Sequence, residues 1–223
     1  MPLPNSFAKK RRTVALAPLV QGGITASSSS TIIDYVNHAQ YQILSNWCWA
    51  ASGAAICDFF LGSTAGKYRY QCENASEFIS GASKCCDVGK PFLKNGTKAL
   101  ARMKDQKNPL HFDLKVACNT GGRAYRVIDG CGKLTSDYDD YSGDGPNATE
   151  LAKIVASIKA RRPFVRRLKW DKGGGHATVV YGYGISTGSK PWFSVADPWD
   201  GIQIEYKSTP RGRWRGSCFV TKK

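Results

Sequence analysis

The sequence predicts an α+β fold of two lobes, a helical lobe first and an antiparallel β-rich lobe second. Two observations support this prediction. Segments with helical periodicity occur up to Pro163, and short runs rich in β-branched and aromatic residues follow it. Helices that precede the strands, rather than alternating with them, are typical of α+β proteins. A chain of 223 residues is long enough to build one sizeable core of this kind.

The first predicted helix begins after Asn46, which we expect to be its N-cap, and ends at about Leu61. It is apolar on nearly every side, so we expect it to be central and buried. The apolar side chains are those of Trp47, Trp49, Ala50, Ala54, Ile56, Phe59 and Phe60.

Three further helices are expected. The second has apolar residues at i, i+3, i+4 and i+7, and the third covers about residues 97–104. The fourth is expected to be capped by Thr149 and ended by Pro163, because proline cannot continue a helix. The periodic positions are Ala75, Phe78, Ile79 and Ala82 in the second helix, and Leu151, Ile154, Val155 and Ile158 in the fourth.

The last third of the chain predicts a series of strands. Their residues are β-branched and aromatic, and Gly, Pro and Asp separate the runs. The expected strands are 164–169, 176–185, 191–197, 201–206 and 217–221.

Cys48 is the first candidate for chemistry. It lies at the expected start of the first helix, where unpaired N–H groups and the positive end of the helix dipole lower the pKa of a thiol. Gln42, six residues upstream, carries an amide that is able to donate to a developing oxyanion. Together they predict a thiolate nucleophile with an oxyanion hole.

His176 is the candidate general base. The chain has three histidines, and His38 and His111 fit surface or packing positions. His176 instead follows three glycines and opens a strand of β-branched and aromatic residues. Asp197 ends the next strand, so in a hairpin pair it would lie beside His176 and orient the imidazole. The other interpretation of Asp197 alone is an Asp-Pro turn.

This arrangement resembles the papain-like cysteine proteases, and most closely the avirulence-type bacterial effector proteases. The resemblance covers about residues 40–104 and 149–206. The unmatched stretch, 105–148, is expected to be an insertion. The shared motifs are the block Asn-Trp-Cys-Trp-Ala-Ala around Cys48, Gln71-Cys72, Cys85-Cys86, the run His-x-x-x-Val-x-Gly from His176, and Asp197-Pro198.

The resemblance implies a papain-like two-lobe fold with the active site between the lobes. It also implies that Cys48 is the nucleophile, His176 the general base, Asp197 the orienting residue and Gln42 part of the oxyanion hole. The expected function is therefore that of a thiol protease, a cysteine endopeptidase that hydrolyses peptide bonds. The same triad would also serve deamidation or transglutamination. An alternative of another class is a non-enzymatic, basic, disulfide-braced toxin or binding module.

The resemblance further implies a secreted or injected bacterial effector or toxin with a virulence role. Its expected partner is a protein substrate of a host or competitor cell, and we expect a monomer. Residues 1–30 are basic and Ser-rich without periodicity, so they predict a flexible leader or pro-segment before a protease domain at 31–223. This leader is only loosely similar to a signal peptide.

The eight cysteines favour an oxidising compartment. With Cys48 set aside, seven remain, so at least one is expected to be free or to pair between chains. Cys57 is expected to be a buried free thiol in the first helix. The expected disulfides are Cys118–Cys131, and Cys72 with either Cys85 or Cys86.

The net charge of +15 is compatible with several functions. Arginines interleaved with aromatic residues are able to bind single-stranded nucleic acid, and a basic face attracts anionic membranes or acidic substrates. We favour a solvated basic face and expect no nucleic acid. No apolar stretch is long enough to span a membrane. No metal or other cofactor is expected, because Cys-x-x-Cys pairs are absent, histidines are few, and the acidic residues near Asp137 miss the EF-hand spacing.

Overall fold

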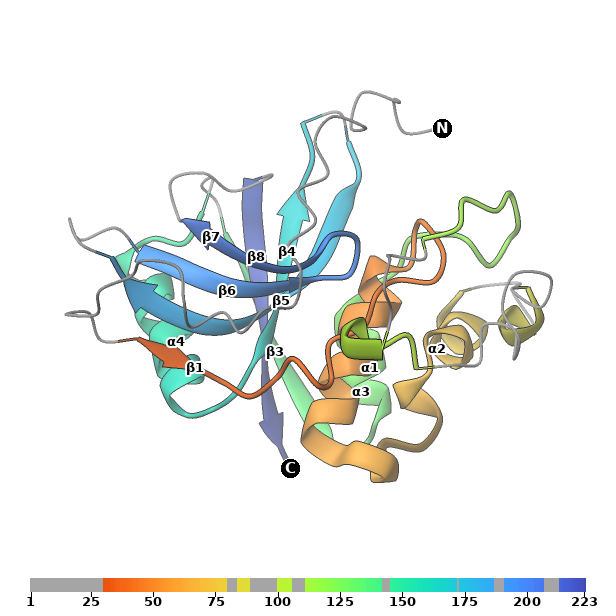
Figure 1. The fold of residues 1–223 in the computed structure, drawn as a ribbon, viewed down its shortest axis with the longest axis horizontal. Coiled ribbons are helices and arrows are strands. Elements are labelled where there is room, and N and C mark those ends of the chain that lie inside the picture. The colour runs from red at the N-terminus through yellow and green to blue at the C-terminus, as the bar shows by residue number, and fades with distance from the viewer. Residues whose placement is uncertain are drawn as a thin grey trace.

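The computed structural model describes residues 30–79, 84–88, 100–105, 111–141, 145–171, 173–186, 191–206 and 213–223. These residues form an α+β fold in which three helices gather on one side and the strands on the other (Figure 1). The predicted fold class is confirmed. The expected leader falls almost wholly outside the described residues.

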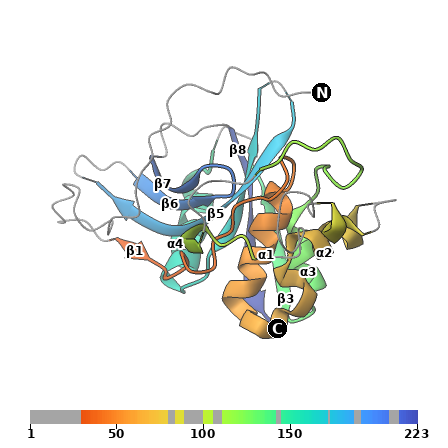
Figure 2. The ribbon, with the colours of Figure 1, turned by 45° about the vertical axis from the view of Figure 1, so that its right-hand side comes forward.

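The helical lobe is built around α1 (Cys48–Leu61), most of whose residues are buried. Against it lie α2 (Gln71–Phe78) and α3 (Ala124–Gly130). Three 3₁₀ segments complete the described helical structure of this lobe: η2 (Gly62–Arg69), η3 (Cys85–Asp87) and η4 (Met103–Asp105). A fourth helix, α4 (Ala148–Lys159), contacts the sheet instead. Figure 2 shows α4 on the side of β1 and β5, apart from the other three helices.

The described strands form a seven-stranded sheet in the order β3-β8-β4-β5-β6-β7, with β1 paired to β5. Each pair is antiparallel. The strands are β1 (Thr31–Ile32), β3 (Leu134–Asp140), β4 (Phe164–Lys169), β5 (Gly175–Ile185), β6 (Pro191–Asp197), β7 (Gly201–Tyr206) and β8 (Arg213–Lys222).

The strand predictions are confirmed with small changes at the ends. β4, β6 and β7 have the expected bounds, β5 begins one residue earlier, and β8 is longer at both ends. The expected hairpin partnership of β5 and β6 is also present, with Val179 opposite Ala196.

Two predicted helix caps are wrong. Asn46 does not cap α1; its backbone N–H and its side chain both bond to Asn119, at 2.9 Å each, and the helix begins two residues later. α4 is capped by Asn147, whose side chain accepts from Glu150 N while the Glu150 carboxylate accepts from Asn147 N. This reciprocal capping box satisfies two N–H groups, which Thr149 cannot do because it is already the second residue of the helix.

The second and third predicted helices are only partly described. α2 begins earlier than the periodicity suggested and ends at Phe78, and Ala82 lies outside the described residues. Within 100–105 the chain forms only the 3₁₀ turn η4 and a bridge between Gln40 and Arg102, in place of the expected end of an α-helix.

The described residues of the expected insertion, within 111–141 and 145–148, contribute to the core. Its α3 approaches α1 so closely that a Cβ added at Gly53 would lie 2.6 Å from Val127 Cβ. Its β3 pairs along its whole length with β8. Within the described residues, no helix is long and apolar enough to cross a membrane.

Candidate active site

Cys48 is the first residue of α1, and its thiol is free and partly exposed. The N-cap residue, Trp47, makes no side-chain hydrogen bond to the helix. The first N–H groups of α1 therefore have no capping side chain and are available to an anion.

The two tryptophans that flank Cys48 hold it in place. Both are almost fully buried. Trp47 Nε1 donates to the Cys118 carbonyl at 2.6 Å, and Trp49 Nε1 donates to the Thr120 carbonyl at 3.1 Å. The ring of Trp49 also lies where a Cβ of Gly122 would stand, at 2.4 Å, so this position requires glycine. The start of α1 is thus fixed to the segment 118–122.

His176 lies near the start of β5 and is almost buried. Its Nε2 is 2.7 Å from Asp197 Oδ1 at the end of β6. The ring stacks on Trp170 with centroids 5.8 Å apart. Cys48 is close enough to this imidazole that its thiol contributes to raising the pKa of His176. Since Nε2 is taken by Asp197, Nδ1 is the ring nitrogen that remains for the thiol.

Asp197 is buried and has two partners at the same oxygen. Its Oδ1 accepts from His176 Nε2 and, at 2.8 Å, from the backbone N–H of Trp199. Burial by itself would raise the pKa of this carboxyl, but the imidazole and the Trp199 N–H outweigh burial and lower it. Asp197 is therefore an anion over the physiological pH range.

The electrostatics of His176 favour the imidazolium. Burial lowers its pKa, but the charge and hydrogen bond of Asp197, together with Cys48, outweigh burial and raise the pKa to about 10. A protonated imidazole beside a thiol favours the thiolate.

Gln42 is buried close to these residues. Its backbone N–H donates to the Pro198 carbonyl at 2.9 Å, and its own carbonyl accepts from His111 N at 2.9 Å. The side-chain Nε2 donates to the carbonyls of Leu44, at 3.1 Å, and Ser45, at 2.5 Å. Both amide hydrogens thus bond to backbone carbonyls here, and the role of Gln42 in an oxyanion hole stays a prediction.

The segment 111–122 was not expected at this site. Asn119 receives the backbone N–H of Asn46 and donates its amide to Ser45 Oγ and the Leu114 carbonyl, both at 2.9 Å. The His111 ring stacks on Trp199, with centroids 4.2 Å apart. This stretch has no hydrophobic periodicity, so nothing in its sequence indicated that it covers the helix start.

The disulfides differ from those expected. Cys118 pairs with Cys85, and Cys131 pairs with Cys57, so the Cys118–Cys131 prediction and the free Cys57 are both wrong. Cys72 pairs with Cys86, one of the two partners considered. The physical reason is the packing of α3 on α1, which brings Cys131 to the middle of the buried helix. The free cysteines are Cys48 and Cys218.

The basic residues that follow α4 in the sequence do not form one surface patch; they are Arg161, Arg162, Arg166, Arg167 and Lys169. Arg166 is buried and forms a two-point ion pair with Glu205, at 2.7 and 3.1 Å. Its Nε donates to Thr178 Oγ1 at 3.0 Å, and its guanidinium lies over the Trp214 ring. Among the described residues, no group of His, Cys, Asp and Glu side chains is arranged to hold a metal ion.

Comparison with known proteins supports the fold. No family model matches the chain, and no curated protein matches its sequence. Among solved structures, the crystal structure of UfSP from C. elegans aligns with a TM-score of 0.50 at 9% identity, over 92% of this chain and 36% of that chain. This chain thus spans about a third of the length of UfSP.

Two further structures align less well. The recombinant stem bromelain precursor gives a TM-score of 0.41 at 12% identity, over 87% of this chain and 70% of that one. The Pseudomonas avirulence protein AvrPphB gives 0.32 at 16%, over 88% and 96%. At these identities the likeness concerns the fold alone, and the chain has the papain-like α+β fold that the sequence predicted.

Proposed function

We propose that this chain is a cysteine endopeptidase in which Cys48, His176 and Asp197 act as a catalytic triad. The observation that supports it best is the 2.7 Å contact of His176 Nε2 with Asp197 Oδ1, together with the contribution of the Cys48 thiol to the raised pKa of the same imidazole. The thiol also stands at the start of a helix that lacks a capping side chain. The order nucleophile, base and orienting group is the one that the proposed chemistry needs.

In the proposed reaction, the Cys48 thiolate attacks a peptide carbonyl while His176 holds a proton on Nδ1. The tetrahedral oxyanion is stabilised by the Cys48 backbone N–H and by the Gln42 amide, which would first exchange one of its backbone carbonyl partners for the oxyanion. The C–N bond breaks as Nδ1 gives its proton to the leaving amine. Water then attacks the thioester, His176 takes up a proton from it, and the new carboxylic acid leaves Cys48 as a free thiolate.

A compartment follows from the cysteines as a further part of the proposal. Three disulfides persist in an oxidising environment and not in the cytosol of most cells. We therefore propose a secreted or delivered protease, with an effector or toxin role on a protein of a host or competitor cell.

Digestion of a degenerate peptide library with intact-mass readout tests the proposed activity. Wild type should release shorter peptides, and Cys48→Ala should release none. Products one dalton heavier with the chain intact would show that the triad is used for deamidation instead. Joined peptides would indicate transglutamination. An unchanged library, with Cys48 inert to alkylation, would leave the non-enzymatic binding module as the function.

A further inference from the structure

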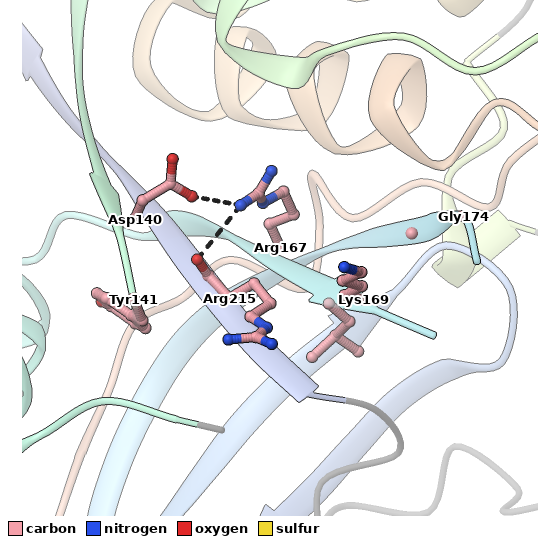
Figure 3. A pocket seen from close by; sticks show the side chains of 8 residues that line it. Asp140, Tyr141, Arg167, Lys169, Gly174 and Arg215 are labelled. Carbon is pink, nitrogen blue, oxygen red and sulfur yellow. Dashed lines mark hydrogen bonds and ion pairs between the residues drawn. The ribbon is translucent and has the colours of Figure 1, made fainter. Parts of the chain in front are cut away.

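Two groups of polar side chains lie near the elements that carry the candidate triad. One group, which includes Arg167 and Lys169, lines a cavity of about 660 Å³ at β3, β4, β5 and β8 (Figure 3). Both residues alternate along β4 with Leu168, the strand partner of His176, so their side chains leave the opposite face of the sheet. The second group surrounds Gln42, the residue expected to bind the oxyanion.

Gln71 belongs to the second group and is fully buried at the start of α2. The next residue, Cys72, forms a disulfide with Cys86, so the first turn of α2 is tethered to η3. A buried amide has to place both its N–H donors and its carbonyl oxygen on partners. The described partners of the Gln71 side chain lie in the segment 40–43.

The Gln71 side chain bonds to the peptide groups on both sides of Gln42. Its Nε2 donates to the Tyr41 carbonyl at 2.8 Å, and its Oε1 accepts from Ile43 N at 3.1 Å. Nε2 also donates to Gln40 Oε1 at 3.2 Å. One side chain thus contacts both of the planar peptide units that meet at the Gln42 Cα.

The other polar groups of these two peptide units are bonded as well. Gln42 N donates to the Pro198 carbonyl, and the Gln42 carbonyl accepts from His111 N, both at 2.9 Å. Pro198 directly follows Asp197, so the Gln42 backbone is joined to the strand end that carries the acidic member of the candidate triad. Because each peptide unit is planar and bonded through its N–H and its C=O, the direction in which the Gln42 side chain leaves the backbone is fixed.

The placement of the Gln42 amide determines whether it stabilises an oxyanion. A donor has to lie about 2.7–3.1 Å from the oxygen that develops in the transition state. With the backbone held, only the Gln42 side chain has to turn from the Leu44 and Ser45 carbonyls to that oxygen. An amide is suited to holding this backbone, because it bonds a carbonyl and an N–H at once, which neither a carboxylate nor an ammonium does.

We propose that Gln71 is a positioning residue for the reaction, which holds the backbone of Gln42 so that the Gln42 amide meets the developing oxyanion. This inference rests on the proposed protease function and adds a residue that does not itself touch the substrate. Asn119 holds Ser45 and Asn46 beside the nucleophile. Gln71 holds the opposite end of the same segment, where the oxyanion is bound.

Gln71→Met tests the role, because methionine is of similar length and has no amide. With a library peptide that wild type cleaves, kcat and kcat/KM should fall together by about a hundredfold, since the lost interaction is made only in the transition state. Alkylation of Cys48 by iodoacetamide should stay within about twofold of the wild-type rate, because it needs the thiolate but forms no oxyanion. A wild-type kcat, or an equal loss of alkylation and turnover, would overturn the positioning role.

Asn74→Leu is the matched control. Asn74 is another fully buried amide of α2, but its side chain donates to the Tyr68 carbonyl, at 3.1 Å. Both variants should lower the melting temperature, because each leaves a buried backbone group without its partner. Asn74→Leu should nevertheless keep the wild-type kcat. An equal loss of kcat in the two variants would show that Gln71 acts only through the stability of α2, against the proposal.

A double variant separates positioning from any other effect of Gln71. Gln42→Ala alone should lower kcat by about a hundredfold or more, as expected for the loss of an oxyanion donor. Adding Gln71→Met should then cost less than about a further threefold, because no amide is left to position. Losses that multiply would show that the two residues act independently, and the proposal would be wrong.

Gln71→Glu decides the matter if Gln71→Met does not fold. The introduced carboxyl still accepts from Ile43 N, but as an anion it faces the oxygens of Tyr41 and Gln40. Protonation restores one donor, so the kcat of this variant relative to wild type should rise as the pH falls. A ratio that does not change with pH would contradict the role and leave the protease intact. A library that wild type neither cuts nor modifies would instead overturn the protease, and the role of Gln71 with it.

Discussion

Arg166 and Glu205 form a two-point ion pair buried within the sheet, although β4 and β7 are separated by β5 and β6. The pair bridges the sheet, and Thr178 on β5 takes the third bond of the guanidinium. Burial is the largest influence on the pKa of Asp197 and raises it. His176 and the Trp199 N–H lower this pKa, and Arg166 adds a smaller lowering effect. The ion pair therefore both links strands of the sheet and helps to keep Asp197 of the candidate triad ionised.

Arg166→Met should lower the free energy of unfolding by about 3–5 kcal/mol, because it leaves the Glu205 carboxylate buried without its partner. Adding Glu205→Leu should recover most of this loss, since no unpaired charge then remains. Urea unfolding of wild type, both single variants and the double variant measures the coupling. A double variant as unstable as Arg166→Met would show that the pair does not stabilise the sheet in this way.

Asp197→Asn should move the alkaline limb of kcat/KM to lower pH. Burial lowers the pKa of His176, and the Asp197 charge is the largest of the influences that raise it to about 10. In the unfolded chain the pKa of His176 is about 6.5, and the stability contributed by the imidazolium is fully present below this pH. In folded wild type the imidazolium, and with it this stability, is lost only as the pH rises through about 10. Removing the charge lets burial dominate, so deprotonation occurs at lower pH.

The kcat of Asp197→Asn should also fall, by about a hundredfold or more. The kcat of Asp197→Ala should fall further, because alanine cannot accept the hydrogen bond that asparagine still accepts from the imidazole. The pH profiles of the two variants and wild type are the measurement. If Asp197→Ala kept both the wild-type kcat and the alkaline limb, Asp197 would be only the first residue of an Asp-Pro turn.

Iodoacetamide at mildly acidic pH should modify Cys48 and spare Cys218. Cys218 is the other free thiol, and burial raises its pKa to about 12, so it is almost never a thiolate under these conditions. Peptide mapping after brief alkylation identifies the labelled residue. His176→Ala should slow the reaction by at least about tenfold. Labelling at Cys218 alone, or an unaffected rate in His176→Ala, would contradict the proposed thiolate–imidazolium pair.

The double variant Cys85→Ser, Cys118→Ser should lose both stability and reactivity at Cys48. The bond closes a loop with a sequence separation of 33, and opening it should lower the free energy of unfolding by about 3–4 kcal/mol. The Cys118 carbonyl accepts from Trp47 beside the nucleophile, so freeing this residue loosens the start of α1. Both cysteines are replaced so that no new thiol attacks Cys72–Cys86.

The control for this prediction is Cys57→Ala, Cys131→Ala. Its bond, with a sequence separation of 74, is attached nine residues further along α1. It should also cost stability but leave the rate of Cys48 alkylation close to that of wild type. Equal slowing of alkylation in both double variants would show that the Cys85–Cys118 bond has no specific effect on the site.

The sequence predicted the strands better than their partners. β5 and β6 are apolar runs between turn residues, so their bounds and the meeting of His176 with Asp197 followed from local pattern. β3 was missed because it reads Leu-Thr-Ser-Asp-Tyr-Asp-Asp, a polar segment of low strand propensity. It becomes a strand because β8 supplies a partner at each of its residues.

In the candidate site, too, local sequence pattern predicted some residues and missed those that depend on tertiary contacts. Cys48, His176 and Asp197 were indicated by residue type at the ends of regular elements. The contribution of Asn119 was not, because its position depends on the Cys85–Cys118 bond and on the fold of a segment without periodicity. The incorrect cap at Asn46 has the same origin, since a tertiary partner displaced the local bond.

The position of β8 has a consequence for the order in which the protein matures during synthesis. β8 is the last of the described strands to be translated, yet it lies between β3 and β4, two strands made long before it. Neither of these strands has its β8 partner until the ribosome has released residues 213–222. The described sheet that carries His176 and Asp197 therefore cannot be completed until β8 has been translated, although both of these residues are made earlier.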